Sequence, residues 1–236
     1  MIHDPGGVSR FVRGLIEEHK ETSAQGAPFV TISREAGAGG RTLAEAILRA
    51  MSKRPEHRLW KGWQIFDREL CEAVMKDPRI RVSLEALMSE KERGDFEDML
   101  ASFFGGESPQ ARVDHAIFKT VHEVASVGRA IIVGRGAACC TRHLELGVRI
   151  RLIAPRELRV KRIAQRRSVS EHEAKQWVAE QDDHRARLVR RCFHKDINDP
   201  LLYDAIFNTD TLEMSSIAEA VLTLIERRVA EAGASA

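Results

Sequence analysis

The 236-residue sequence has no long hydrophobic run and no strong excess of charge of either sign. It contains no run of about 18 consecutive apolar residues, the length that a membrane-spanning helix needs. Residues 1–20 also lack the apolar core of a signal peptide. From these two absences we expect a soluble, cytoplasmic protein with no membrane partner.

Cationic and anionic side chains nearly balance, with 37 Lys and Arg against 35 Asp and Glu and a formal net charge of +2. So small an excess argues against a general polyanion-binding protein, although arginines gather between Arg149 and Arg191. No basic run is long enough to follow a nucleic-acid groove, so nucleic-acid binding is the less favoured explanation of that cluster.

Metal-binding patterns of cysteine and histidine are absent as well. The four cysteines, of which Cys139 and Cys140 are adjacent, form no C-x-x-C pair and show no metal-ligand spacing with histidines. Two adjacent cysteines suit neither a shared zinc ion nor a relaxed disulfide. We therefore expect reduced cysteines that serve as packing residues, and we assign no histidine to a metal.

The most informative stretch that is present runs from Phe29 to Met51 and reads FVTISREAGAGGRTLAEAILRAM. A β-branched and aromatic run is followed by three glycines and then by the apolar spacing of an amphipathic helix. Backbone without Cβ atoms folds closely around an anion, and the N–H groups of a helix beginning near Arg41 point towards it. This predicts a phosphate cradle, although a tight strand-to-helix connection explains the same residues.

The stretch differs from the common phosphate-binding pattern G-x-x-x-x-G-K-[ST] at two positions. Arg34 stands at the place of the first glycine, and Gly40 stands at the place of the lysine, followed by Arg41 and Thr42. The lysine that reaches the β- and γ-phosphates in that pattern is therefore missing.

The rest of the chain alternates strand and helix signals. Short apolar runs predict strands at Phe29–Ile32, Gln64–Phe66, Ala130–Val133, Val148–Ile153 and Ala205–Thr209. Helical spacing predicts helices at 41–51, 114–126, 156–167 and 215–232, and another after the capping box Ser170–Glu173. The alternation is that of a three-layer α/β fold, a parallel sheet with helices on both faces.

We expect one α/β domain over residues 28–236, preceded by an N-terminal extension over residues 1–27. The helical pieces at about 68–110 have the size of an insertion that covers a substrate. Asp67 and Arg68 follow the strand at 64–66, at the edge of the sheet where ligands of open α/β proteins bind.

Arginines follow two of the predicted strands. Arg135 lies between two glycines after the strand at 130–133, where a guanidinium fork can reach a phosphate, although a surface turn is the alternative. Arg159, Arg162 and Arg166 share one helix face. A solvated basic face is the ordinary explanation, but such charges repel by about 0.2–0.5 kcal/mol per pair, which a bound anion would offset.

From Phe29 to about Arg228 the chain resembles the cytidylate kinase-like branch of the P-loop nucleoside monophosphate kinases. The matching segments are TISREAGAGGRTLA, IFDREL, VGRGA, PRELRVKRI, EQDDHRAR and DPLLYDAIFNTD, in this order. The resemblance implies a P-loop NTPase fold with five parallel strands, a helical region that closes over the acceptor and an arginine-bearing lid at about 156–195. It implies transfer of the γ-phosphoryl group of ATP to a small nucleotide, with CMP or dCMP as the expected acceptor.

The resemblance also implies roles for individual residues. The phosphates of ATP would be bound by Arg34, Gly37, Ala38, Gly39, Gly40 and Arg41. The Thr42 hydroxyl would hold Mg²⁺. The acceptor would be bound by Asp67, Arg68, Arg135, Asp183 and Arg185. The charge of the phosphoryl group in transit would be neutralised by Arg41, Arg135, Arg159 and Arg162.

The missing lysine leaves three hypotheses open. In the first, the protein is a phosphotransferase in which Arg41 or Arg34 replaces the lysine. In the second, it is a nucleotide-binding regulator without turnover. In the third, it is a P-loop kinase with another small-molecule acceptor, because the segment at 68–110 is the least family-like part of the chain. The oligomeric state does not follow from the sequence.

Overall fold

The computed structural model describes residues 27–54, 58–67, 94, 97 and 109–234. The predicted N-terminal extension lies outside the described residues except for Ala27. Nearly all of the predicted helical insertion at 68–110 also lies outside them, and so does Arg68.

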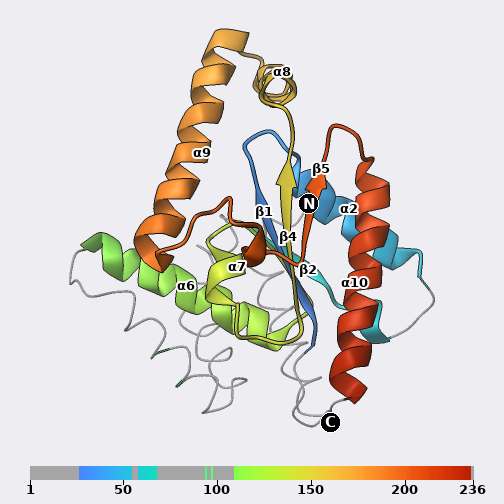
Figure 1. The fold of residues 1–236 in the computed structure, drawn as a ribbon. Helices are drawn as coiled ribbons and strands as arrows, with labels where there is room; N and C mark the ends of the chain where they lie inside the picture. Colours follow the sequence, from blue (N-terminus) through green and yellow to red (C-terminus); the bar gives the residue numbers. More distant parts are fainter. Residues whose placement is uncertain (1–26, 55–57, 68–93, 95–96, 98–108, 235–236) are drawn as a thin grey trace.

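Five parallel strands form one sheet in the order β2-β3-β1-β4-β5 (Figure 1). They are β1 (Phe29–Arg34), β2 (Gln64–Phe66), β3 (Ala130–Val133), β4 (Gly147–Ile153) and β5 (Ala205–Asn208). The central strand β1 pairs with β3 on one side and with β4 on the other. The five predicted strands are confirmed, and because β1 is central, the glycine-rich loop leaves the sheet at its middle.

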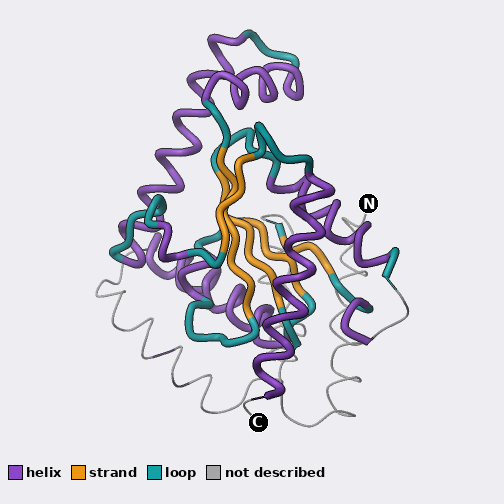
Figure 2. Tube along the Cα trace, turned by 45° about the vertical axis from the view of Figure 1, so that its right-hand side comes forward, coloured by secondary structure: helices purple, strands orange, loops and turns teal. Residues whose placement is uncertain are grey.

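Helices cover both faces of the sheet (Figure 2). On one face, α2 (Gly40–Ser52) and α10 (Met214–Ala234) pack against Val30 and Ile32 of β1. On the other face, α6 (Pro109–Val127), α7 (Ala137–Cys140) and the last turns of α9 (Glu171–Phe193) pack around Phe29. A parallel strand buried on both sides needs apolar side chains on both, which explains the continuous apolar runs of β1 and β3.

Helices α8 (Arg156–Arg167) and α9 form a hairpin that projects beyond the carboxyl ends of the strands (Figure 1). The predicted capping box begins α9, because the Ser170 hydroxyl accepts from the Glu173 N–H while the Glu173 carboxylate accepts from the Ser170 N–H. The hairpin has a small apolar cluster of its own, which includes Val160 and Val178 and which Ala36 of the glycine-rich loop joins. The hairpin is thereby packed directly against that loop.

Short elements are the part of the fold that the sequence did not predict. The four-residue α7 and the 3-10 turns η1 (Arg58–Trp60) and η2 (Pro200–Leu202) are too short for a periodic signal. Among the described cysteines, Cys139, Cys140 and Cys192 are buried and form no disulfide, which confirms the packing prediction for them. Within the described residues, no helix combines the length and the apolarity needed to cross a membrane.

Arg149 of β4 belongs to the arginine-rich stretch but serves the interior of the fold. Its side chain is buried beside the Phe29 ring, and its guanidinium donates to the main-chain oxygens of Gly147 at 3.2 Å, Leu144 at 2.7 Å and Thr141. Burial is the main reason that the pKa of Arg149 is lowered. The side chain ties the segment before β4 to the sheet.

We predict that Arg149→Leu lowers the free energy of unfolding by about 2–4 kcal/mol, because it leaves buried carbonyl oxygens without donors. The matched control is Arg142→Leu, which removes an exposed arginine with one bond to the Leu201 oxygen and should change stability by less than about 0.5 kcal/mol. Urea unfolding measures both. Equal effects would contradict the structural role of Arg149.

Candidate active site

The glycine-rich loop connects β1 to α2 at the carboxyl edge of the sheet (Figure 1). Gly37 and Gly39 have φ angles of 85° and 91°, and α2 begins at Gly40, which confirms the predicted strand, loop and helix. The first turn of α2 carries no acidic residue, and its N–H groups have no acceptors within the helix. Such a helix start attracts an anion.

The side chain of Arg34 passes directly over Gly40. A Cβ atom added to Gly40 would lie 3.1 Å from Cγ and 3.2 Å from Cδ of Arg34. A Cβ atom added to Gly134, at the end of β3, would overlap Nη1 of the same side chain. Glycine at both positions leaves the room that this side chain fills. A lysine at position 40 would press against the Arg34 side chain, which would have to shift by a few tenths of an ångström.

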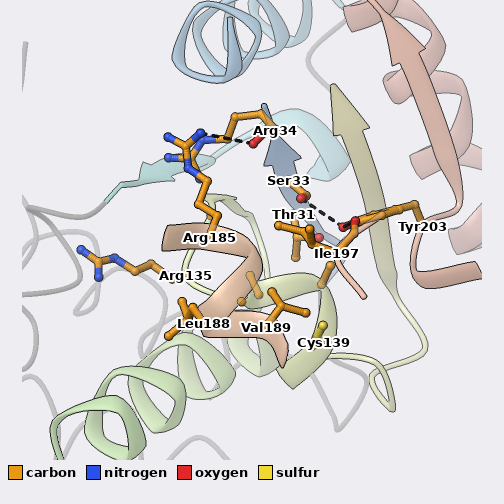
Figure 3. A pocket seen from close by; sticks show the side chains of 14 residues that line it. Thr31, Ser33, Arg34, Arg135, Cys139, Arg185, Leu188, Val189, Ile197 and Tyr203 are labelled. Carbon is orange, nitrogen blue, oxygen red and sulfur yellow. Dashed lines mark hydrogen bonds between the residues drawn. The ribbon is translucent and has the colours of Figure 1, made fainter. Parts of the chain in front are cut away.

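The Arg34 guanidinium lies among other cations. Burial, followed by repulsion from Arg185 and Arg135, lowers the pKa of Arg34 to about 9, so the group still carries its charge at neutral pH. It forms no hydrogen bond or ion pair with any residue in the described part of the chain. The guanidinium groups of Arg34 and Arg185 lie close together, whereas that of Arg135 extends away from them (Figure 3). An anion between Arg34 and Arg185 would relieve their repulsion.

These arginines line a small pocket with a cavity volume of about 50 Å³. Arg34 comes from the end of β1, Arg135 from the loop after β3 and Arg185 from α9 (Figure 3). Farther in, the lining includes Thr31, Ser33, Cys139, Val189, Ile197 and Tyr203. This volume is well below the about 300–1,000 Å³ that is usual for small-molecule pockets, so the described residues enclose only part of a substrate site.

Arg159 lies behind the glycine-rich loop and outside the pocket lining. Its buried guanidinium donates to the main-chain oxygens of Ala154 at 2.9 Å and Ala36 at 3.0 Å. It also donates to the Asp182 carboxylate at 2.7 Å, and the other oxygen of that carboxylate accepts the Ala36 N–H at 2.7 Å. Arg159 and Asp182 thus hold both polar main-chain groups of Ala36, which fixes the loop to the α8–α9 hairpin.

Arg41 also lies outside the pocket lining. It is exposed and donates to Asp67 at 2.8 Å and to Glu45 at 3.2 Å. The structure therefore places the predicted phosphate ligand Arg41 and the predicted acceptor ligand Asp67 in contact with each other. Thr42 is exposed in the first turn of α2, in keeping with a hydroxyl that binds a metal beside the phosphates.

Two more predicted residues point elsewhere. Arg162 donates to the hydroxyl and the main-chain oxygen of Thr209, at 3.0 and 2.7 Å, after β5. Asp183 is exposed and pairs with Arg187 at 2.6 Å on the outer side of α9. Of the predicted ligands, the structure brings Arg34, Arg135 and Arg185 together around one pocket near the loop glycines, and it places Arg41, Arg159, Arg162 and Asp183 outside its lining.

Sequence reasoning missed two residues that organise this region, and in both cases a pattern was available. Asp182 lies three residues before Arg185 and shares its helix face, with 3.4 Å between Oδ1 and Nη1, whereas Asp183 lies on another face. Arg151 alternates with Arg149 along β4, so the two side chains share a face of the sheet. Arg151 donates to the Asn198 side chain at 2.8 Å and to Ser33 at 3.2 Å.

The model of the cytidylate kinase-like family matches residues 29–211 of this sequence, which include the loop, the pocket and the hairpin. The chain belongs to the cytidylate kinase-like family. A cytidylate kinase of Pyrococcus horikoshii is 32% identical over 97 residues, which are 41% of this chain and 50% of that protein. The chain thus spans half the length of this curated relative. The family supports a kinase-type phosphotransferase.

Two solved structures resemble the fold. An uncharacterized protein from Eubacterium ventriosum has a TM-score of 0.63 at 17% identity, and the match covers 85% of this chain and 98% of that one. A shikimate kinase from Bacteroides thetaiotaomicron has a TM-score of 0.45 at 17% identity, over 84% of this chain and 98% of its own. At 17% identity the first likeness concerns the fold alone, and at a TM-score of 0.45 the second supports no conclusion.

We predict that sulfate raises the thermal unfolding midpoint of the protein, because an anion at Arg34 and Arg185 binds the folded state only. Each kcal/mol of binding free energy should add about 2–4 °C. Arg34→Met should lose more than half of this rise without lowering the midpoint of the free protein, since it removes a repelled charge. Arg187→Met, on the outer side of α9, should keep the full rise. Equal rises in both variants would contradict an anion site at Arg34.

Proposed function

We propose that this protein transfers the γ-phosphoryl group of ATP to a nucleoside monophosphate, with CMP or dCMP as the acceptor. Membership of the cytidylate kinase-like family supports the donor and the class of acceptor. The observation that carries the proposal is the position of the Arg34 guanidinium, over Gly40 and beside Arg185. It supplies a cation where the lysine of the common pattern is missing.

On the donor side, the loop from Gly37 to Arg41 would bind the β-phosphate of ATP through main-chain N–H groups. Its left-handed glycines and the acid-free start of α2 suit that role. The Thr42 hydroxyl would hold Mg²⁺, which when bound neutralises charge on the β- and γ-phosphate oxygens. Arg159 and Asp182 act as positioning residues, because they fix the main chain of Ala36 at the front of this loop.

On the acceptor side, Arg135 and Arg185 would bind the phosphate of the monophosphate, and Arg34, which lies between the glycine-rich loop and Arg185, would bind the oxygens of the group in transit. Phosphoryl transfer depends mainly on positioning and on charge neutralisation, and guanidinium forks match paired phosphate oxygens. Arg185 and Arg135 lie close enough to Arg34 to lower its pKa without any bound substrate, so the positive charge is already in place before the substrate binds. Charge placed in advance costs no reorganisation during the reaction.

Arg34 also bears on the alternatives. The missing lysine suggests a regulator without turnover, and the Arg34 side chain over Gly40 supports the phosphotransferase against that alternative. A P-loop kinase with another small-molecule acceptor stays the second candidate, because the predicted insertion at 68–110 that would cover the acceptor lies almost entirely outside the described residues.

We predict that the full-length protein forms ADP from Mg-ATP in the presence of CMP or dCMP, with a higher kcat/KM than with UMP, AMP or GMP. Arg34→Ala should lower kcat about 10³-fold, by analogy with the value of an arginine that neutralises the phosphoryl group in transit. Arg41→Ala should lower it less than about tenfold, because that side chain pairs with Asp67 and Glu45.

The comparison of the two variants separates the candidate replacements for the lysine. A larger loss for Arg41→Ala than for Arg34→Ala would contradict the assignment of Arg34. A protein that forms no ADP with any monophosphate would contradict the nucleoside monophosphate kinase activity, and a wider panel of small hydroxylated and phosphorylated acceptors would then test the alternative.

A further inference from the structure

Asp182 of α9 lies outside the pocket lining and binds the front of the glycine-rich loop. One of its carboxylate oxygens accepts the Ala36 N–H at 2.7 Å, and the other accepts from Nη1 of Arg159 at 2.7 Å. The same nitrogen of Arg159 donates to the Ala36 main-chain oxygen at 3.0 Å, which closes a ring of hydrogen bonds. Bonds to charged groups at such lengths are the strong ones in proteins. A movement of Ala36 therefore moves Asp182 with it.

The loop also packs tightly against the base of the α8–α9 hairpin (Figure 1). Ala36 is buried in the apolar cluster of the hairpin. A Cβ atom added to Gly37 would lie 2.7 Å from the main-chain oxygen of Arg159, so the loop rests directly on the first turn of α8. One residue before Ala36, the Glu35 carboxylate accepts the Ala154 N–H at 3.0 Å. Residues 35–37 and the base of the hairpin thus form one packed unit.

Asp182 also faces Arg185, the cation of α9 that lines the pocket. The oxygen of Asp182 that binds Ala36 lies 3.4 Å from Nη1 of Arg185, and the Arg34 main-chain oxygen lies 3.4 Å from the same nitrogen (Figure 3). Both distances exceed the about 2.7–3.2 Å of ordinary N–H···O bonds, so these two contacts hold Arg185 loosely in the free protein. Its position depends on two oxygens that are fixed by the start of the loop.

These contacts make the order of the loop and the order of Arg185 depend on each other. A phosphate on the loop N–H groups would fix the main chain between Arg34 and Ala36, and with it both oxygens that Arg185 faces. The guanidinium then loses less freedom when a second phosphate binds to it, because part of the ordering has already taken place. Repulsion between two bound phosphates acts in the opposite direction.

We propose that Asp182 is a positioning residue that couples the two substrate sites, so that a nucleoside triphosphate on the glycine-rich loop tightens the binding of the phosphorylated acceptor at Arg185. Asp182 acts through Ala36 and Arg185. By linkage, the acceptor must tighten the triphosphate by the same factor. The coupling favours the complex with both substrates over the complex with the triphosphate alone, in which water is the only acceptor. The inference rests on the proposed function, which assigns the two ligands to these sites.

Binding to the full-length protein measures this coupling without turnover. CMP is titrated calorimetrically into the protein alone and into the protein saturated with a non-hydrolysable ATP analogue and Mg²⁺. We expect the analogue to tighten CMP about five- to tenfold, at the lower end of the usual coupling between sites. The reverse titration, of the analogue with and without CMP, should give the same factor. A native protein in which the analogue leaves CMP affinity unchanged or weakens it would overturn the inference.

Asp182→Ala removes the connection between the loop and the pocket arginine. Alanine suits the middle of a helix, and Arg159 keeps the Ala36 and Ala154 oxygens as acceptors, so the variant should fold. CMP alone should bind within about threefold of the native affinity, because Asp182 is not part of the pocket lining. The analogue should then tighten CMP by less than about twofold, or weaken it. Glu180→Gln, which changes an exposed acid on the same helix, should keep the full coupling.

Hydrogen exchange tests the connection in the native protein, without any substitution. The Ala36 N–H is bonded to Asp182, and Ala36 is not part of the pocket lining. CMP alone should slow the exchange of this amide, because an Arg185 held by the ligand keeps the carboxylate in place. An exchange rate that CMP leaves unchanged would overturn the inference, whatever the behaviour of the Asp182→Ala variant.

The outcomes separate this inference from the proposed function. Equal coupling in the native protein and in Asp182→Ala would contradict the role of Asp182. A variant that weakens CMP equally with and without the analogue would show a merely structural role and contradict it as well. A protein that couples the two ligands through Asp182 but forms no ADP would refute the proposed function and leave the inference standing. A protein that forms ADP but binds the two ligands independently would do the reverse.

Discussion

The arrangement of the site depends on the side chain of Arg34, which lies against Gly40 and Gly134 at the carboxyl edge of the sheet. The common phosphate-binding pattern has glycine at the position of Arg34 and lysine at the position of Gly40. In this chain the cation and the glycine have exchanged places. The two positions are linked, because a side chain at position 40 would press against that of Arg34.

A second set of contacts joins this loop to the α8–α9 hairpin. Asp182 bonds to the Ala36 N–H, to Arg159 and, at 3.4 Å, to Arg185, which itself reaches the main-chain oxygen of Arg34. The Asp182 carboxylate therefore connects the glycine-rich loop with Arg185, which lines the pocket. Because the network is buried or half-buried, it is screened little by solvent, and each partner limits the movement of the others.

The sequence was sufficient for the fold because periodic signals are strong in a sheet covered on both faces: the five strands and the capping box at Ser170 follow from local pattern. The site was predicted less completely. Arg34, Arg135 and Arg185 line one pocket, as predicted for phosphate ligands. Arg159 has the charge and the helix face that were expected of a phosphate ligand, but its guanidinium binds the main-chain oxygen of Ala36. Whether an arginine contacts the protein or a ligand depends on neighbours from distant parts of the chain, such as Asp182 and Asp67, which local spacing does not reveal.

The most direct test of the exchange is a double-mutant cycle on the rate of ADP formation with Arg34→Gly, Gly40→Lys and the double variant, which restores the common pattern. We expect each single substitution to lower kcat by about 10²- to 10³-fold, the first because the cation is lost and the second because the lysine crowds Arg34. The double variant should recover to within about tenfold of the native rate. A double variant no faster than Arg34→Gly alone would contradict the claim that Arg34 takes the place of the lysine.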